Sequence, residues 1–73
     1  MGNTEFAYNA QKIVEEYCGN DAYIVWMCKA LQNNKALLST DIEDGMYYEV
    51  TYNGDENEFY FDAYKKIENR VIK

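Results

Sequence analysis

Residues 46–53 alternate strictly between two sets of side chains, and no other feature constrains the fold of this chain as much. The apolar or aromatic set comprises Met46, Tyr48, Val50 and Tyr52. A period of two residues is typical of a β-strand that buries one face. The dipeptide that follows, Asn53-Gly54, favours a hairpin, whose loop can have two or four residues, and the four-residue loop gives the better pairing of the strands. The sequence therefore predicts a hairpin, whose second strand runs from residue 57 to about residue 66.

The hairpin also predicts a register between its two strands. We expect three pairs to face each other on the buried side: Val50 with Phe59, Tyr48 with Phe61, and Met46 with Ala63. The end of the second strand has an alternative interpretation, because Tyr64, Ile67 and Val71 have helical spacing. A helix that begins near Ala63 is that alternative.

The start of the chain has the period of a helix. One face of this predicted helix collects the apolar residues Phe6, Ala10, Ile13, Val14 and Tyr17. Asn3 is a good residue to cap the helix start, and Gly19 suits the left-handed conformation in which many helices end. We therefore expect a helix at about residues 4–18.

Residues 22–31 are ambiguous between a strand and a helix. Tyr23, Ile24, Val25 and Trp26 are β-branched or aromatic and favour a strand. The helical alternative has a stripe of Ile24, Met27, Cys28 and Leu31, with Asp21 as its cap. We choose the strand, because Asn33-Asn34 can form a tight turn into a further strand at residues 36–40.

Together these segments predict one α+β domain over residues 1–73, in which an N-terminal helix packs on a four-stranded antiparallel meander sheet. A chain of 73 residues has room for one such domain. The predicted core comprises Phe6, Ile13, Val14, Trp26, Val50 and Phe61.

The charge pattern and the missing residue types exclude several functions. The net charge is −6, and residues 36–62 hold eight acidic residues and no basic one. This charge disfavours direct contact with nucleic acid, because phosphate backbones repel such a chain. There is no histidine and no glycine-rich phosphate loop, so we expect neither catalysis nor a cofactor. Two acidic clusters lack the spacing of a calcium loop, so we expect no metal site.

The two cysteines and the hydropathy indicate a compartment. The first residues do not have the charged, apolar and small-residue pattern of a secretory leader, so we expect none, and no apolar run is long enough to cross a bilayer. We therefore expect a cytoplasmic protein without membrane contact, in which Cys18 and Cys28 stay reduced and structural.

The candidate site lies on the last two predicted strands. Their outward residues include three tyrosines among carboxylates, and tyrosine is enriched at protein interfaces. The candidate protein-binding residues on this face are Tyr47, Glu49, Tyr60, Asp62 and Tyr64. The acidic clusters beside it add Asp41, Glu43, Asp44, Asp55, Glu56 and Glu58. The alternative is that these rings only stabilise cross-strand pairs.

The stretches 25–40 and 44–54, VWMCKALQNNKALLST and DGMYYEVTYNG, resemble an uncharacterised family of small proteins. Phages and mobile elements of Gram-positive bacteria encode that family, and the similarity covers roughly residues 22–70. The resemblance carries no activity and no functional residue. It implies a small protein inside a bacterial host cell.

Three functions compete at this point. In the first, the chain binds and modulates a host or phage protein, including a nucleic-acid-binding machine whose phosphate contacts the carboxylates imitate. In the second, it is a structural or accessory protein that self-associates, for example as a homodimer. In the third, it binds nucleic acid weakly through its aromatic residues and the basic tail Lys65, Lys66, Arg70 and Lys73. In the first function, binding of a basic partner would weaken steeply as the salt concentration rises.

Overall fold

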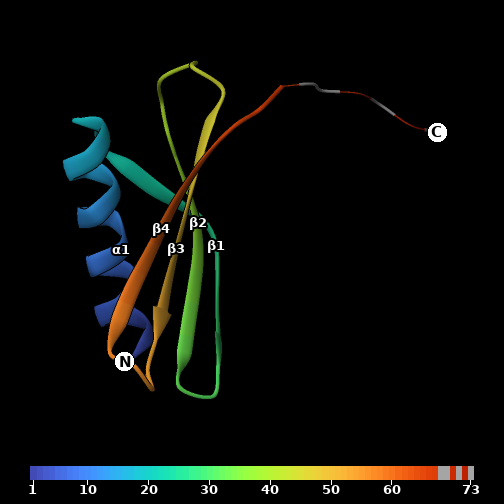
Figure 1. Cartoon of the computed structure of the whole chain (residues 1–73). Helices are drawn as coiled ribbons and strands as arrows, with labels where there is room; N and C mark the ends of the chain where they lie inside the picture. Colours follow the sequence, from blue (N-terminus) through green and yellow to red (C-terminus); the bar gives the residue numbers. More distant parts are fainter. Residues whose placement is uncertain (68–69, 71, 73) are drawn as a thin grey trace.

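A computed structural model describes residues 1–67, 70 and 72, and its helix α1 (Asn3–Cys18) lies along one face of a sheet (Figure 1). The sheet contains β1 (Ala22–Ala30), β2 (Asn33–Thr40), β3 (Met46–Asn53) and β4 (Glu58–Lys65). The strands are ordered β1-β2-β3-β4, and each pairs antiparallel with the next. The predicted α+β meander is therefore confirmed, and the ambiguous segment 22–31 is a strand.

Helix α1 ends as predicted and begins one residue earlier. Gly19 has a φ of 74°, and its N–H donates to the Glu15 carbonyl at 2.8 Å. The predicted Asn3 cap is wrong, because Asn3 is already helical and the extended Gly2 occupies the cap position. The first helical hydrogen bond accordingly runs from the Phe6 N–H to the Gly2 carbonyl, at 2.9 Å.

The core lies between α1 and the sheet. Its buried apolar residues are Phe6, Ala10, Val14, Ala22, Ala36, Leu38, Tyr48, Val50 and Tyr52. The predictions for Phe6, Val14 and Val50 are confirmed, and the half-buried Ile13 and Phe61 pack against this core. Among the described residues, no helix has the length and apolar character needed to cross a membrane.

The predicted core residue Trp26 lies on the opposite face, because β1 contains a β-bulge. Ile24 pairs with Leu38 and Trp26 with the adjacent Leu37, so Val25 is an extra residue without a partner on β2. One extra residue reverses the alternation of every residue after it. The Trp26 side chain therefore points away from α1 and is 44% exposed.

The first hairpin turns two residues before the predicted Asn33-Asn34. Ala30 already pairs with Asn33, so the turn is made by residues 31 and 32, and Leu31 has a φ of 57°. Asn34 belongs to β2 and is buried, and its Nδ2 donates to the Met1 carbonyl at 3.3 Å. This buried contact with the N-terminal segment requires Asn34 in the strand, so the turn must come earlier.

The register of the β3–β4 hairpin is two residues away from the prediction. Tyr52 pairs with Phe59, Val50 with Phe61, and Tyr48 with Ala63. The loop has four residues, as predicted, but it begins after Asn53, whose side chain accepts the N–H groups of Asp55 and Glu56 at 3.0 and 3.3 Å. A shift of two residues preserves the side on which each residue lies.

The strand β4 continues to Lys65, so the helical alternative from Ala63 is wrong, and Val71 lies outside the described residues.

The two turns at the lower end of Figure 1 lie against each other. The Gly54 N–H donates to the Asn33 Oδ1 at 3.1 Å, and a Cβ atom at Gly54 would overlap the Gln32 carbonyl. Glycine at position 54 therefore permits the close approach of the two loops.

Candidate protein-binding face

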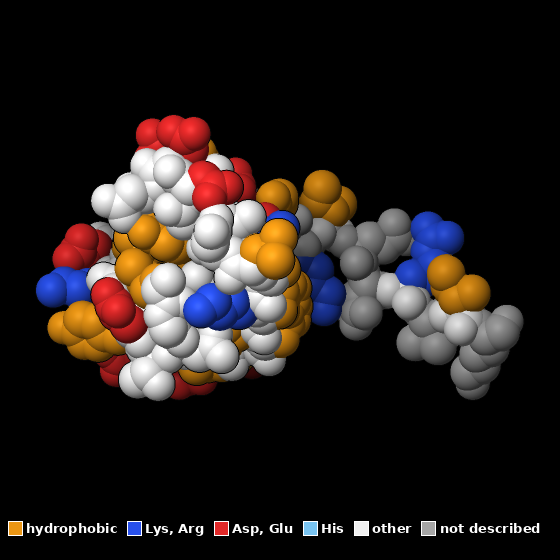
Figure 2. Space-filling model, turned by 90° about the horizontal axis from the view of Figure 1, so that it is seen from below, with side chains coloured by type: hydrophobic (Ala, Val, Ile, Leu, Met, Phe, Trp, Pro, Cys, Tyr) orange, Lys and Arg blue, Asp and Glu red, His pale blue; other side chains and the backbone are white. Residues whose placement is uncertain are grey.

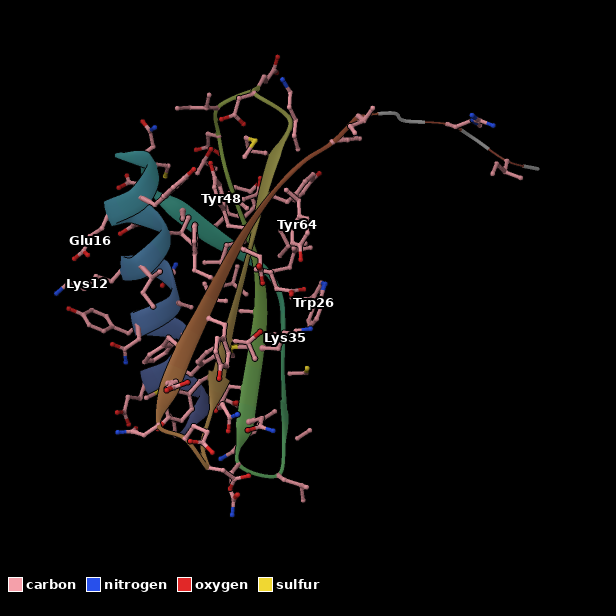
Figure 3. The ribbon with its side chains drawn as sticks, viewed as in Figure 1. Lys12, Glu16, Trp26, Lys35, Tyr48 and Tyr64 are labelled. Carbon is pink, nitrogen blue, oxygen red and sulfur yellow. The ribbon has the colours of Figure 1, made fainter. Side chains whose placement is uncertain are left out.

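No described element covers the face of the sheet that points away from α1. Figure 3 shows Trp26, Lys35 and Tyr64 pointing away from the helix, whereas Tyr48 lies between the helix and the sheet. We call this surface the open face. Its residues are Tyr23, Trp26, Cys28, Lys35, Leu37, Ser39, Tyr47, Glu49, Thr51, Tyr60, Asp62 and Tyr64.

The strand pairing arranges the open face in rows that cross the sheet. One row joins Trp26, Leu37, Glu49 and Asp62. A second row joins Cys28, Lys35, Thr51 and Tyr60, and Tyr47 pairs with Tyr64. The side chains of Tyr23, Trp26, Tyr60 and Tyr64 are between 44% and 51% exposed. The open face therefore combines large, partly exposed rings with a rigid backbone.

The charges at the centre of the open face are partly paired. The Lys35 Nζ lies 3.5 Å from the Glu49 Oε1, and the Glu49 side chain is the less exposed of the two. At the β4 border the Tyr60 hydroxyl donates to the Glu58 Oε2 at 2.9 Å. This hydrogen bond, with the negative charge of Glu58, raises the pKa of Tyr60 above its ordinary value. Tyr60 therefore stays a neutral hydrogen-bond donor at neutral pH.

The predicted binding residues separate into three groups. Tyr47, Glu49, Tyr60, Asp62 and Tyr64 lie together on the open face, as the alternation predicted. The β2–β3 loop holds Asp41, Glu43 and Asp44 at one end of the sheet, and the opposite end holds Asp55, Glu56 and Glu58 (Figure 1). Figure 2 views the molecule from below and shows acidic side chains along the outline of that view, with hydrophobic side chains exposed between them.

Some acidic residues also have local structural roles. The Asp44 Oδ1 accepts the Met46 N–H at 3.0 Å, which shapes the start of β3. Among the described residues, no three His, Cys, Asp or Glu side chains form a group that could hold a metal ion. The acidic residues of the two clusters lie in and beside the loops at the two ends of the sheet.

The sequence-based prediction missed the contribution of β1 and β2 to this face. Tyr23, Trp26, Lys35 and Leu37 extend it from two strands to four. The one available signal was the uninterrupted apolar run from Tyr23 to Met27, since a strand with one exposed face alternates unless a bulge intervenes.

A shallow hollow of about 340 Å³ on α1 is another surface feature that could hold a ligand. Tyr8, Gln11, Lys12 and Glu15 line it. The Gln11 Nε2 donates to the Ala22 carbonyl at 3.1 Å, and the Glu15 Oε2 accepts the Ala22 N–H at 2.9 Å. Two of its four side chains are therefore occupied in fastening β1 to the helix.

Comparison with known proteins gives a family and no activity. A family model described as a family of unknown function (DUF6275) matches residues 3–73. No curated protein matches the chain. No solved structure matches it either.

Proposed function

The chain belongs to this family of unknown function, and we propose that it acts by binding another protein through its open face, without catalysing a reaction. The observation that carries the proposal is the exposure of four aromatic side chains on the face that α1 leaves uncovered. Exposed faces of antiparallel sheets usually carry polar residues. Tyrosine and tryptophan instead supply the buried anchors of protein interfaces.

The partner that fits this surface carries positive charge around an apolar centre. The acidic groups at both ends of the sheet surround the rings, and the chain as a whole has a net charge of −6. Charges at the border of an interface mainly steer association, whereas central aromatic residues hold the complex.

The finer part of the proposal concerns context. We propose a host or phage protein in the bacterial cytoplasm as the partner, which the chain modulates or inhibits, and the resemblance to phage proteins supports this context. Where the partner is a nucleic-acid-binding machine, the acidic ends imitate phosphates.

Capture from a bacterial lysate, followed by mass spectrometry, identifies the partner, and variants then test the open face. The variant Trp26→Ala/Tyr64→Ala should weaken binding of the identified protein at least about tenfold, because central rings typically contribute more than 1 kcal/mol each. The control Tyr8→Ala removes a ring that is 65% exposed on α1 and should bind like the parent chain. Equal binding by a folded double variant contradicts the proposal, and so does capture that the control weakens equally.

Salt distinguishes this function from self-association through the open face. Binding of a basic partner should weaken as ionic strength rises, because exposed charges are screened. Self-association driven by the rings should persist.

A further inference from the structure

The two edges of the sheet differ in their protection. On β1, the bulge at Val25 interrupts the edge, and the side chains of Gln11 and Glu15 bind the carbonyl and the N–H of Ala22. Bulges and covering elements are ways in which natural sheets protect an edge from pairing with another chain. The β1 edge is therefore closed at its start and distorted a few residues later.

The β4 edge lacks both kinds of protection over its described length. Its pairing with β3 is regular from Glu58 to Lys65, without a bulge and without proline. The Lys66 N–H donates to the Gly45 carbonyl at 2.6 Å, which makes these two residues a hydrogen-bonded pair. Hydrogen-bonded and non-hydrogen-bonded pairs alternate in an antiparallel ladder. The N–H and carbonyl groups of Phe59, Phe61 and Ala63 therefore point outward, away from β3.

The same residues form an incompletely covered apolar strip on the helix side of the sheet. Phe59 is 37% exposed, although its ring stacks on Phe6 with a centroid distance of 6.4 Å. Phe61 is half-buried against the Tyr17 ring, at 4.9 Å, and Ala63 is exposed. The strip needs further apolar cover at the position where the backbone groups are free.

We propose that the occupant of this edge is the β4 strand of a second copy of the chain, paired antiparallel about a two-fold axis at Phe61. Strands related by such an axis keep equivalent faces on the same side of the joined sheet, which requires Phe61 to face Phe61 of the second copy. Phe59 of one copy then faces Ala63 of the other. Phe59, Phe61 and Ala63 are the residues whose backbone N–H and carbonyl groups point outward, so they can bond across the axis. The result is a continuous eight-stranded sheet with both helices on one side.

The charges of β4 select this register over its neighbours. With Phe61 on the axis, Tyr60 faces Asp62 of the second copy and Glu58 faces Tyr64, so no like charges are opposed. If the axis lay at Asp62, Asp62 would face Asp62 of the second copy. If the axis lay at Tyr60, Asp62 would face Glu58 of the second copy. Like charges directly opposite each other destabilise strand pairing.

Light scattering after size exclusion, over a wide range of concentration, tests the dimer, whose expected mass is twice the 8.6 kDa of the chain. Amide exchange of Phe59, Phe61 and Ala63 should slow as concentration rises, because these N–H groups become bonded in the dimer. A chain that stays monomeric throughout overturns the proposal. A dimer that leaves these three amides unprotected, or that Trp26→Ala disrupts instead, also overturns it, because it forms through the open face.

Three variants test the register. Ala63→Pro removes an outward N–H, which edge strands tolerate, and should weaken dimerisation at least about tenfold while circular dichroism stays unchanged. Tyr60→Glu should weaken the dimer, because it opposes Asp62, whereas Tyr60→Lys should strengthen it. The last two variants keep the proposal testable if Ala63→Pro does not fold. Unchanged dimerisation in a folded Ala63→Pro variant, or equal effects of the two Tyr60 variants, overturns the proposal.

Discussion

Tyr48 is a buried weak acid at the contact between α1 and the sheet. Its side chain is 3% exposed, and its ring lies 5.9 Å from Tyr17 and 6.0 Å from Phe61, measured between centroids. Burial raises the pKa of Tyr48 above its ordinary value of 10.0, and the negative charge of Asp44 raises it further. The folded protein therefore keeps the Tyr48 proton at a pH at which the unfolded chain has begun to release it.

This difference predicts a loss of stability in alkali. The contribution of neutral Tyr48 is fully present below the ordinary pKa of 10.0 and declines as pH rises from there through the folded pKa. Urea unfolding at a series of pH values above neutral should therefore show a falling free energy of unfolding near and above pH 10.0. The variant Tyr48→Phe should make the decline shallower, whereas the exposed control Tyr8→Phe should not. A Tyr48→Phe decline as steep as that of the parent chain would exclude Tyr48 as the cause.

Trp26 is a residue that the sequence pattern placed on the wrong face of the sheet. A large aromatic residue in an apolar run is most simply placed in the core, and Trp26 has no polar neighbour between Tyr23 and Met27 to indicate an exposed position. The bulge at Val25 places Trp26 on the open face, and a bulge is set by pairing with β2 rather than by the run itself. Trp26 therefore lies in the candidate site because of how β1 pairs with β2, and not because of its neighbours in the sequence.

At the scale of elements, α1 fastens the start of the edge strand β1. The Glu15 carboxylate accepts the Ala22 N–H, and Gln11 donates to the Ala22 carbonyl, so both outward backbone groups of Ala22 are satisfied. These contacts connect the end of the helix to the first strand across the short segment after Gly19. They fix the start of β1 against the helix.

Removing one of these contacts should loosen the β1 start without unfolding the domain. Glu15→Ala leaves the Ala22 N–H without its acceptor and should cost about 1 kcal/mol of stability. Amide exchange at Ala22 should become at least about fivefold faster, since local opening becomes easier. The neighbouring Glu16 points to solvent (Figure 3), so Glu16→Ala is the matched control and should leave this amide unchanged. Equal exchange at Ala22 in the two variants would show that the Glu15 contact contributes nothing.

The elements were predictable to different degrees for physical reasons. Periodicity identified α1 and β3, because each buries one face of a regular repeat. The first turn lies two residues before the predicted one, because Asn34 bonds the N-terminal segment. The second hairpin has the predicted four-residue loop, but its strand pairing is offset by two residues, because the Asn53 side chain binds the loop N–H groups of Asp55 and Glu56. Such side-chain contacts depend on residues distant in sequence or on loop geometry, which a repeat does not encode.

At the scale of the whole molecule, the two acidic clusters lie at the two ends of the sheet, whereas the four partly exposed rings of the open face lie between them. The alternation predicted the tyrosines of β3 and β4, but six of the eight acidic residues of the sequence block 36–62 divide between the two ends of the sheet, and only Glu49 and Asp62 lie among the rings. A hairpin returns the chain to the end from which it started, so consecutive loops of a meander lie at opposite ends. The acidic residues of the candidate site therefore lie farther apart in the fold than their positions in the sequence suggest.

This distribution predicts how the domain responds to salt. Thirteen acidic residues against seven basic ones give a net charge of −6, and self-repulsion of this kind opposes the compact state. The repulsion acts over about 30 Å at 0.01 M salt and over about 8 Å at 0.15 M. Sodium chloride should therefore raise the urea midpoint of unfolding.

Two matched variants should change this response in opposite directions. Asp55→Asn/Glu56→Gln reduces the net charge to −4 and should make the rise in midpoint smaller, whereas Lys29→Gln increases it to −7 and should make the rise larger. Both changes lie at exposed positions, so neither removes a buried contact. Sodium chloride is the appropriate salt, because sulfate would also strengthen apolar burial. The same response in all three proteins would show that the acidic ends are too far apart, or too well solvated, to repel each other. The acidic ends would then affect the binding of a partner but not the stability of the domain.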